Sequence, residues 1–133
     1  MANFDSDSVT SFSIGSNGGL FGDREVAAGS RPISIAVDPT GRFAYVANAS
    51  SGISTFAISP GNGEITEVGT ELAVGGGPSS IAVDPTGRFV YLTNFNSVRT
   101  FAIDPDTGTL SAVGSGVATG TEAISITVTD ALE

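Results

Sequence analysis

The side chains that could do chemistry in this sequence are carboxylates, arginines, amides and hydroxyls. Its 133 residues include no histidine, no cysteine and no tryptophan, and all five basic residues are arginines. This composition excludes a Ser-His or Cys-His nucleophile pair and a zinc site with Cys or His ligands. A hydrolytic reaction would need a carboxylate as its general base, or a water bound to a metal ion.

Four polar residues are candidates for a ligand site: Arg31, Asn48, Asn94 and Glu122. Asn48 and Asn94 stand at matching places in a repeated unit, where an expected strand ends and a loop begins. Asparagine at such a place also caps a turn by bonding its own backbone. Arg31 and Glu122 interrupt the repeat, since the matching residue between them is Gly77. We expect all four on one face of the molecule, around a small molecule or a carbohydrate.

Two short segments resemble the start of a calcium loop. Oxygen ligands alternate in Asp5-Ser6-Asp7 and in Asp104-Pro105-Asp106. Neither segment continues to the remaining ligands or to the bidentate glutamate of a full loop, and solvated turns are the simpler interpretation. We therefore expect no cofactor. If calcium binds, we expect it at Asp5 and Asp7, or at Asp104 and Asp106.

The chain is built from an internal repeat with a period of about 45 residues. The matching segments are 33–48 with 79–94, 53–58 with 98–103 and 9–14, and 124–129 with the start of 33–48. Each unit predicts short strands rich in β-branched and aromatic residues, separated by turns such as Asp38-Pro39-Thr40-Gly41. Four antiparallel strands in about 45 residues are typical of one blade of a β-propeller.

The apolar pattern also favours a propeller. The first two strands of each unit, such as 81–83 and 89–92, are apolar on both faces. A sheet with one face in water would alternate apolar and polar residues instead. We therefore expect these strands to be sandwiched between neighbouring blades.

The run from Pro78 to Asn94, with Arg88-Phe89-Val90-Tyr91-Leu92-Thr93-Asn94 at its end, resembles the YVTN-type, lactonase-like β-propeller repeat. That family includes phosphogluconolactonase-like enzymes and surface-layer propellers. The resemblance implies a propeller of about seven blades and, as one function, a lactone hydrolase or isomerase. Lactonizing propellers of this kind rely on His and Arg at the channel face, and this chain has no histidine to match.

We expect one all-β domain over residues 1–131, a partial β-propeller of roughly three four-stranded antiparallel blades. Its expected parts are an incomplete first blade at 8–27, complete blades at 33–74 and 79–118, and a lone inner strand at 123–129. Leu132-Glu133 is interpreted as a vector scar. The chain could equally be a piece of a longer propeller, natural or engineered.

Three blades cannot close a ring without splaying, so we expect the chain to assemble with itself. In the expected homodimer, Ile124–Val128 of each copy adds to the Val9–Ile14 sheet of the other, closing a ring of six blades. A trimer of about nine blades is the alternative, and it exceeds the usual range of four to eight.

The sequence favours a self-assembling scaffold or binding module without assignable catalytic activity, with a lactone hydrolase or isomerase as the alternative. The formal charge of −9 gives no attraction for phosphate backbones, so we expect no nucleic-acid partner. We expect no membrane partner either, because no apolar run reaches a membrane-spanning length. The absence of a signal peptide favours the cytoplasm, and a secreted or cell-surface location stays open.

Overall fold

The computed structural model describes residues 1–129, and this part of the chain consists of strands and turns without a helix. Accordingly, it holds no helix of the length and apolarity that a membrane span requires. The strands are β1 (Ala2–Asn3), β2 (Ser8–Ile14), β3 (Leu20–Ala27), β4 (Pro32–Val37), β5 (Phe43–Asn48), β6 (Gly52–Ile58), β7 (Ile65–Glu67), β8 (Leu72–Ala73), β9 (Ser80–Val83), β10 (Phe89–Asn94), β11 (Ser97–Ile103) and β12 (Leu110–Ala118).

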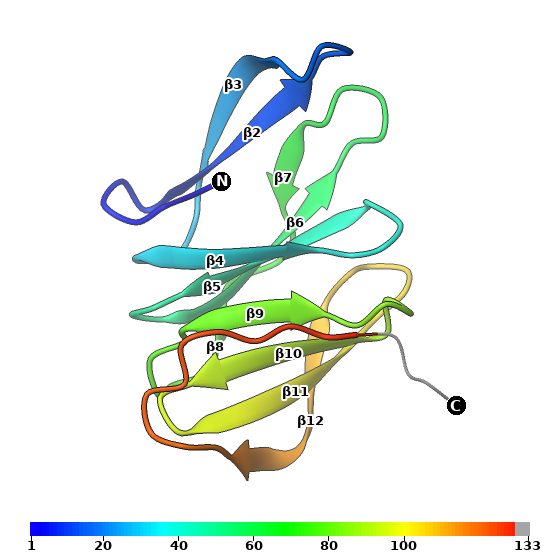
Figure 1. Ribbon diagram of the computed structural model, residues 1–133. Coiled ribbons are helices and arrows are strands. Elements are labelled where there is room, and N and C mark those ends of the chain that lie inside the picture. Colours follow the sequence, from blue (N-terminus) through cyan, green and yellow to red (C-terminus); the bar gives the residue numbers. More distant parts are fainter. Residues whose placement is uncertain (130–133) are drawn as a thin grey trace.

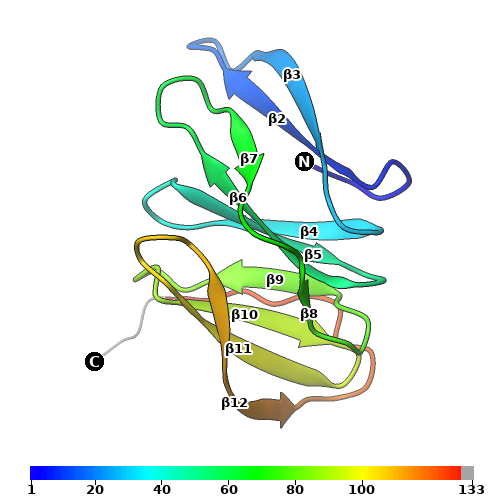
Figure 2. The same cartoon turned by 180° about the vertical axis from the view of Figure 1, so that it is seen from behind.

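These strands form three antiparallel sheets that lie one above another (Figures 1 and 2). Blade 1 has the order β1-β2-β3, blade 2 the order β4-β5-β6-β7 with β8 also paired to β6, and blade 3 the order β9-β10-β11-β12. The inner strands β4 and β9 face each other between blades 2 and 3. The expected all-β architecture, a partial propeller of antiparallel blades, is confirmed.

Of the strands that were expected to be apolar on both faces, β5 is buried throughout, whereas β4, β9 and β10 include half-buried or exposed residues. All six residues of β5 are buried, because alternate side chains enter different cores. Tyr45 joins Leu92 and Phe101 in the core between blades 2 and 3, whereas Val46 joins Phe56 in the core between blades 1 and 2. Each blade is therefore held by packing against its neighbours as well as by its own hydrogen-bonded ladder.

The segment 123–129, expected as an inner strand, is not assigned to any ladder in the described part of the chain. Its backbone nevertheless runs beside β9 (Figure 1), where Ile126 donates its amide to Ser80 Oγ at 3.3 Å. A strand needs a neighbour to complete its hydrogen bonds, and none lies at its far edge within residues 1–129. Leu132 and Glu133, interpreted as a vector scar, lie outside the described residues.

A buried aspartate organises the first turn of blades 2 and 3. Asp38 Oδ1 accepts hydrogen bonds from the amides of Arg42 at 2.7 Å and Phe43 at 2.8 Å, and Asp84 repeats this with Arg88 and Phe89 at 2.8 and 2.9 Å. Burial by itself pushes the pKa of each carboxyl up, but the threonine hydroxyl and backbone amides that bond the charged form together hold each pKa below its usual value.

This arrangement predicts a loss of stability in acid. Because the pKa of Asp84 is lower in the folded chain than the ordinary 3.8, the charged form stabilises the fold above that pH and is lost as the pH falls below it. We expect Asp84→Asn to lower the free energy of unfolding by about 1–3 kcal/mol at pH 7, and by much less at pH 3. Denaturant unfolding at the two pH values measures both differences. The control is Asp106→Asn in an exposed turn, and an equal loss at both pH values for Asp84→Asn would contradict the prediction.

Candidate functional site

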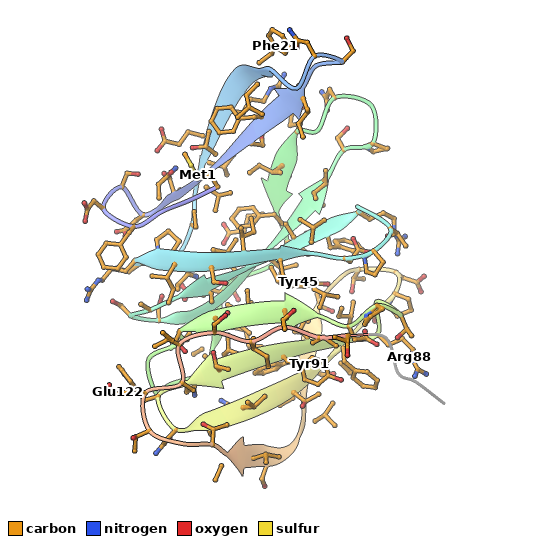
Figure 3. The ribbon with its side chains drawn as sticks, in the orientation of Figure 1. Met1, Phe21, Tyr45, Arg88, Tyr91 and Glu122 are labelled. Carbon is orange, nitrogen blue, oxygen red and sulfur yellow. The ribbon has the colours of Figure 1, made fainter. Side chains whose placement is uncertain are left out.

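The polar candidates gather at one end of the blades, which we call the crossover face because the chain crosses there from one blade to the next. It consists of the loops that lead into β4, β9 and the segment 123–129, together with the loops after β1, β5 and β10. In Figure 3, Glu122 marks this end and Arg88 the opposite one. Arg31, Asn48, Asn94 and Glu122 all belong to the crossover face, so the expected gathering at one end is present.

The calcium candidates are divided between the two ends. Asp5 and Asp7 lie in the loop between β1 and β2 at the crossover face, whereas Asp104 and Asp106 lie in the β11–β12 hairpin at the other end. Asp7 Oδ1 accepts the amide of Arg31 at 2.7 Å, and Asp104 accepts the amides of Asp106 and Thr107. Residues 1–129 contain no group of three or more acidic side chains placed to hold a metal ion. The expectation of no cofactor, with these two segments as the places for calcium if it binds, stays a prediction.

The three crossovers into an inner strand share an unusual backbone conformation. Arg31 and Glu122 both have φ of 59°, and the matching Gly77 has φ of 61°. Glycine adopts this left-handed conformation freely, but a residue with a side chain is disfavoured by about 1–2 kcal/mol. Two charged residues are therefore kept at strained positions of the crossover face, a pattern that clusters at functional sites.

Arg31 is held from both sides. Its guanidinium carbon lies 4.5 Å from the centre of the Phe4 ring, and its carbonyl accepts the amide of Ala49 at 2.8 Å. Stacking on an aromatic face orients a guanidinium while leaving its edge free to donate hydrogen bonds. Arg31 therefore presents an oriented cation on a molecule whose net charge is negative.

Asn48 and Asn94 are buried, and each has an acceptor without a donor. Asn48 donates to Ser54 Oγ at 2.9 Å and to Glu71 Oε1 at 3.4 Å, while Asn94 donates to the carbonyl of Gly75 at 3.4 Å. The Oδ1 atom of each asparagine finds no hydrogen-bond partner among the described residues. A buried acceptor left unpaired costs about 1–3 kcal/mol, so each Oδ1 atom is expected to take a donor such as a water molecule or a ligand hydroxyl.

The structure adds Glu71 and Glu25, which the sequence analysis did not select. Strand pairing aligns Ser8 with Ala27 in blade 1 and Gly52 with Ala73 in blade 2, so the two glutamates occupy matching places. The signal was present in the sequence: Glu25-Val26-Ala27 returns as Glu71-Leu72-Ala73 and then as Gly116-Val117-Ala118. It is short and lies on the outer strand, where the repeat is least regular.

These glutamates belong to a repeated polar group of an asparagine, a hydroxyl and a carboxylate. In blade 1, Asn3 donates to Thr10 Oγ1 at 2.7 Å, which matches the contact of Asn48 with Ser54 in blade 2. Glu25 accepts the hydroxyl of Ser8, whereas Glu71 accepts the Asn48 amide. In blade 3 the hydroxyl is replaced by Arg99, whose Nη1 donates to the carbonyl of Val74 at 2.6 Å. The crossover face thus offers carboxylates, guanidinium groups and unpaired amide acceptors from adjacent blades.

Stacked antiparallel sheets of three, five and four strands, with their polar groups at the crossovers, define the described part of the chain as a β-propeller. Residues 21–126 match the family described as "Lactonase, 7-bladed beta-propeller", and the chain belongs to that family. The resemblance noted from the repeat is therefore confirmed.

Solved structures share this fold. A candidate 6-phosphogluconolactonase from Bacteroides fragilis superposes with a TM-score of 0.85 at 23% identity, over 92% of this chain and 36% of its own. The periplasmic gluconolactonase of Pseudomonas aeruginosa gives 0.74 at 29% identity, over 90% and 36%. A functionally unknown protein from Desulfotomaculum acetoxidans gives 0.72 at 31% identity, over 89% and 38%. The chain thus spans little more than a third of the length of these structures. No curated protein matches it.

Proposed function

We propose that the crossover face of this chain forms part of a site that hydrolyses lactones of sugar acids. The proposal rests on the buried, unpaired Oδ1 atoms of Asn48 and Asn94, which lie at the same face as Arg31 and Glu71. Membership of the lactonase family and similarity to a gluconolactonase support this enzymatic alternative over the non-catalytic scaffold that the sequence favoured.

Each group has a role that suits such a substrate. The hydroxyls of a sugar lactone would donate to the two asparagine acceptors, and a guanidinium such as that of Arg31 would stabilise the negative charge that develops on the carbonyl oxygen. Glu71, oriented by the Asn48 amide, would accept a proton from water as the water oxygen attacks the carbonyl carbon. The ring C–O bond then breaks, and the proton passes to the departing ring oxygen, which leaves an open hydroxy acid.

Glu71→Gln is expected to lower kcat/KM for hydrolysis of δ-gluconolactone at least about 100-fold, because the amide cannot accept the proton from water. The matched control is Glu67→Gln, an exposed glutamate of β7. Acid release above the spontaneous rate measures both variants against the unmodified chain. Equal rates for Glu71→Gln and the unmodified chain would contradict the role of Glu71, and a rate equal to the buffer for the unmodified chain would contradict the proposed function.

A further inference from the structure

The repeated polar group of the crossover face reverses its charge in blade 3. In blade 2 the group consists of Asn48, Ser54 and Glu71, joined through the Asn48 amide. In blade 3 the repeat places Arg99 where blade 2 has Ser54, and Gly116 where blade 2 has Glu71. The two replacements are adjacent, because a Cβ atom on Gly116 would lie 3.4 Å from Arg99 Cγ. Blade 3 thus has a cation and no carboxylate at this place.

The guanidinium of Arg99 is held in one orientation between blades 2 and 3. Its carbon lies 5.3 Å from the centre of the Phe101 ring, and its Nη1 donates to the carbonyl of Val74 at 2.6 Å. The side chain is half-buried, and among the described residues it makes no other hydrogen bond and no ion pair. A guanidinium has further N–H donors, and a charge partly removed from water is costly without a counter-ion. The free donors therefore favour an anion from a ligand.

Asn94 lies next to this guanidinium and offers the opposite kind of group. Its Nδ2 donates to the carbonyl of Gly75 at 3.4 Å, and Gly75 follows directly after Val74, whose carbonyl accepts from Arg99. Asn94 is 6% exposed, and its Oδ1 has no donor among the described residues. The crossover into β9 therefore holds free N–H donors and a buried free acceptor side by side.

A 2-hydroxy carboxylate satisfies both kinds of group. Its carboxylate oxygens accept N–H groups of Arg99, in a pairing that is frequently bidentate, and the hydroxyl on its neighbouring carbon donates to Asn94 Oδ1. Blade 2 already contains a carboxylate at the matching place, since Glu71 Oε1 accepts the Asn48 amide at 3.4 Å. In blade 3 the ligand supplies the carboxylate that the chain supplies in blade 2.

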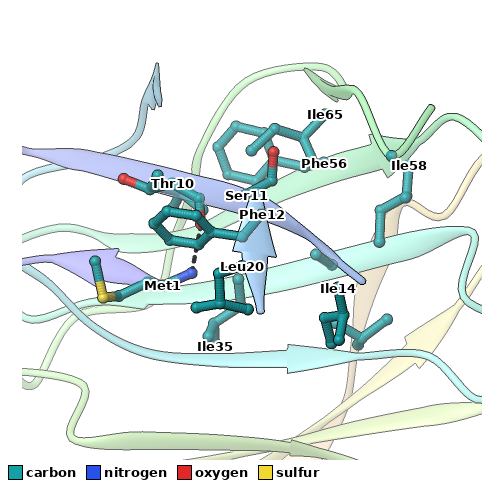
Figure 4. Close-up of a pocket in the computed structure, with 14 residues that line it drawn as sticks. Met1, Thr10, Ser11, Phe12, Ile14, Leu20, Ile35, Phe56, Ile58 and Ile65 are labelled. Carbon is teal, nitrogen blue, oxygen red and sulfur yellow. Dashed lines mark hydrogen bonds between the residues drawn. The ribbon is translucent and has the colours of Figure 1, made fainter. Parts of the chain in front are cut away.

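The cavity between blades 1 and 2 suits such a ligand poorly. Its wall is mainly apolar and includes Phe12, Ile35 and Phe56 (Figure 4). No charged side chain lines it, and a carboxylate in an apolar space without a partner is strongly disfavoured. A carboxylate ligand therefore belongs at the crossover into β9.

We propose that Arg99 and Asn94 bind the carboxylate and the adjacent hydroxyl of a sugar acid, the product of the proposed lactone hydrolysis. The class of 2-hydroxy acids follows from these two side chains, whereas the sugar acid rests on the proposed function. A lactone carries no charge at the atoms that become the carboxylate, so Arg99 favours the open acid over the substrate. Accumulated product is therefore expected to inhibit hydrolysis.

The first test is a titration of the isotope-labelled chain with sodium gluconate at constant ionic strength, followed by NMR of side-chain N–H groups. We expect the signals of Arg99 Nε and the Asn94 amide to shift. Arg99→Ser introduces the residue that blade 2 has at this place and is expected to weaken binding at least about tenfold. The control is Arg24→Ser, which removes the same charge from an exposed side chain. Unshifted signals in the unmodified chain, or equal affinities for the two variants, would overturn the proposal.

The second test fills the site from within the chain. Gly116→Glu adds a carboxylate where blade 2 has Glu71, and its Cβ atom would meet no atom closer than 3.4 Å. We expect this carboxylate to pair with Arg99 and to weaken gluconate binding at least about tenfold. The control is Gly61→Glu, which adds the same charge where a Cβ atom has no neighbour within 4 Å. Equal affinities for Gly116→Glu and Gly61→Glu would contradict the role of Arg99.

The role of Asn94 is tested with lactate and propionate, which differ only in the 2-hydroxyl group. Lactate is expected to bind at least about threefold more tightly, because its hydroxyl satisfies Asn94 Oδ1, and equal affinities would contradict this role. Binding of these acids is measured without lactone. A chain that binds gluconate but hydrolyses no lactone would therefore contradict the proposed function alone, and hydrolysis without gluconate binding would contradict this inference alone.

Discussion

Tyr45→Ala is expected to lower the free energy of unfolding by about 3–5 kcal/mol, the range for truncating a large buried aromatic side chain. The Tyr45 side chain is 0% exposed, packs between blades 2 and 3, and donates its hydroxyl to the carbonyl of Gly108 in blade 3 at 2.9 Å. Burial, together with the charge of Asp38 and against that of Arg42, raises the pKa of Tyr45, so the hydroxyl stays protonated at neutral pH.

The control for Tyr45 is Phe95→Ala. Phe95 is 62% exposed at the crossover face, so its removal deletes an aromatic ring without opening a cavity between blades. Unfolding of both variants by denaturant is followed by far-ultraviolet circular dichroism, because tyrosine fluorescence is unsuitable for a variant that lacks Tyr45. If both variants unfolded at the same denaturant concentration, the blade 2–blade 3 core would not carry the stability that we assign to it.

Gly52→Ala is expected to lower the free energy of unfolding by about 2–3 kcal/mol, since overpacking of a tight contact costs this much. A Cβ atom on Gly52 would lie 2.0 Å from the carbonyl oxygen of Leu72. That oxygen belongs to β8, which pairs with β6 at Gly52↔Ala73 and Ile53↔Leu72. The obstacle is backbone, so β8 itself must move away to admit the methyl group.

The matched control for Gly52 is Gly61→Ala in the β6–β7 hairpin. A Cβ atom at Gly61 would meet no atom within 4 Å, and both substitutions reduce the freedom of the unfolded chain in the same way. Thermal unfolding of the two variants therefore isolates the clash with Leu72. Equal melting temperatures for the two variants would show that β8 can move away from the added methyl group without a loss of stability.

The sequence was sufficient to predict the elements that depend on interactions between neighbouring residues. Asp38 and Asp84 each begin a turn that their own side chains bond, and strands β5 and β10 are apolar on both faces. These features need only nearby residues, so they recur wherever the repeat does. The placement of Arg31, Asn48, Asn94 and Glu122 at one end of the blades also followed, because position within the repeat determines the end at which a residue lies.

The candidate site was predicted only in part. Glu71 meets Asn48 across three strands of one sheet, and this contact depends on how β8 pairs with β6. The sequence could not show which amide oxygens lack a donor, because Asn3, Asn48 and Asn94 share one residue type but have different neighbours. The amide oxygens without a donor could be identified only from the positions of all their possible hydrogen-bond partners.

From the sequence alone follow the repeat, its turns, its strands and therefore the propeller, because each depends on residues close together in the chain. Only the tertiary structure decided the strained conformations of Arg31 and Glu122, the pairing of Glu71 with Asn48 and the unpaired edge of the segment 123–129. These features depend on contacts between residues far apart in the sequence. Such contacts exist only when the blades are stacked, and the repeat does not specify what covers the blades at its ends.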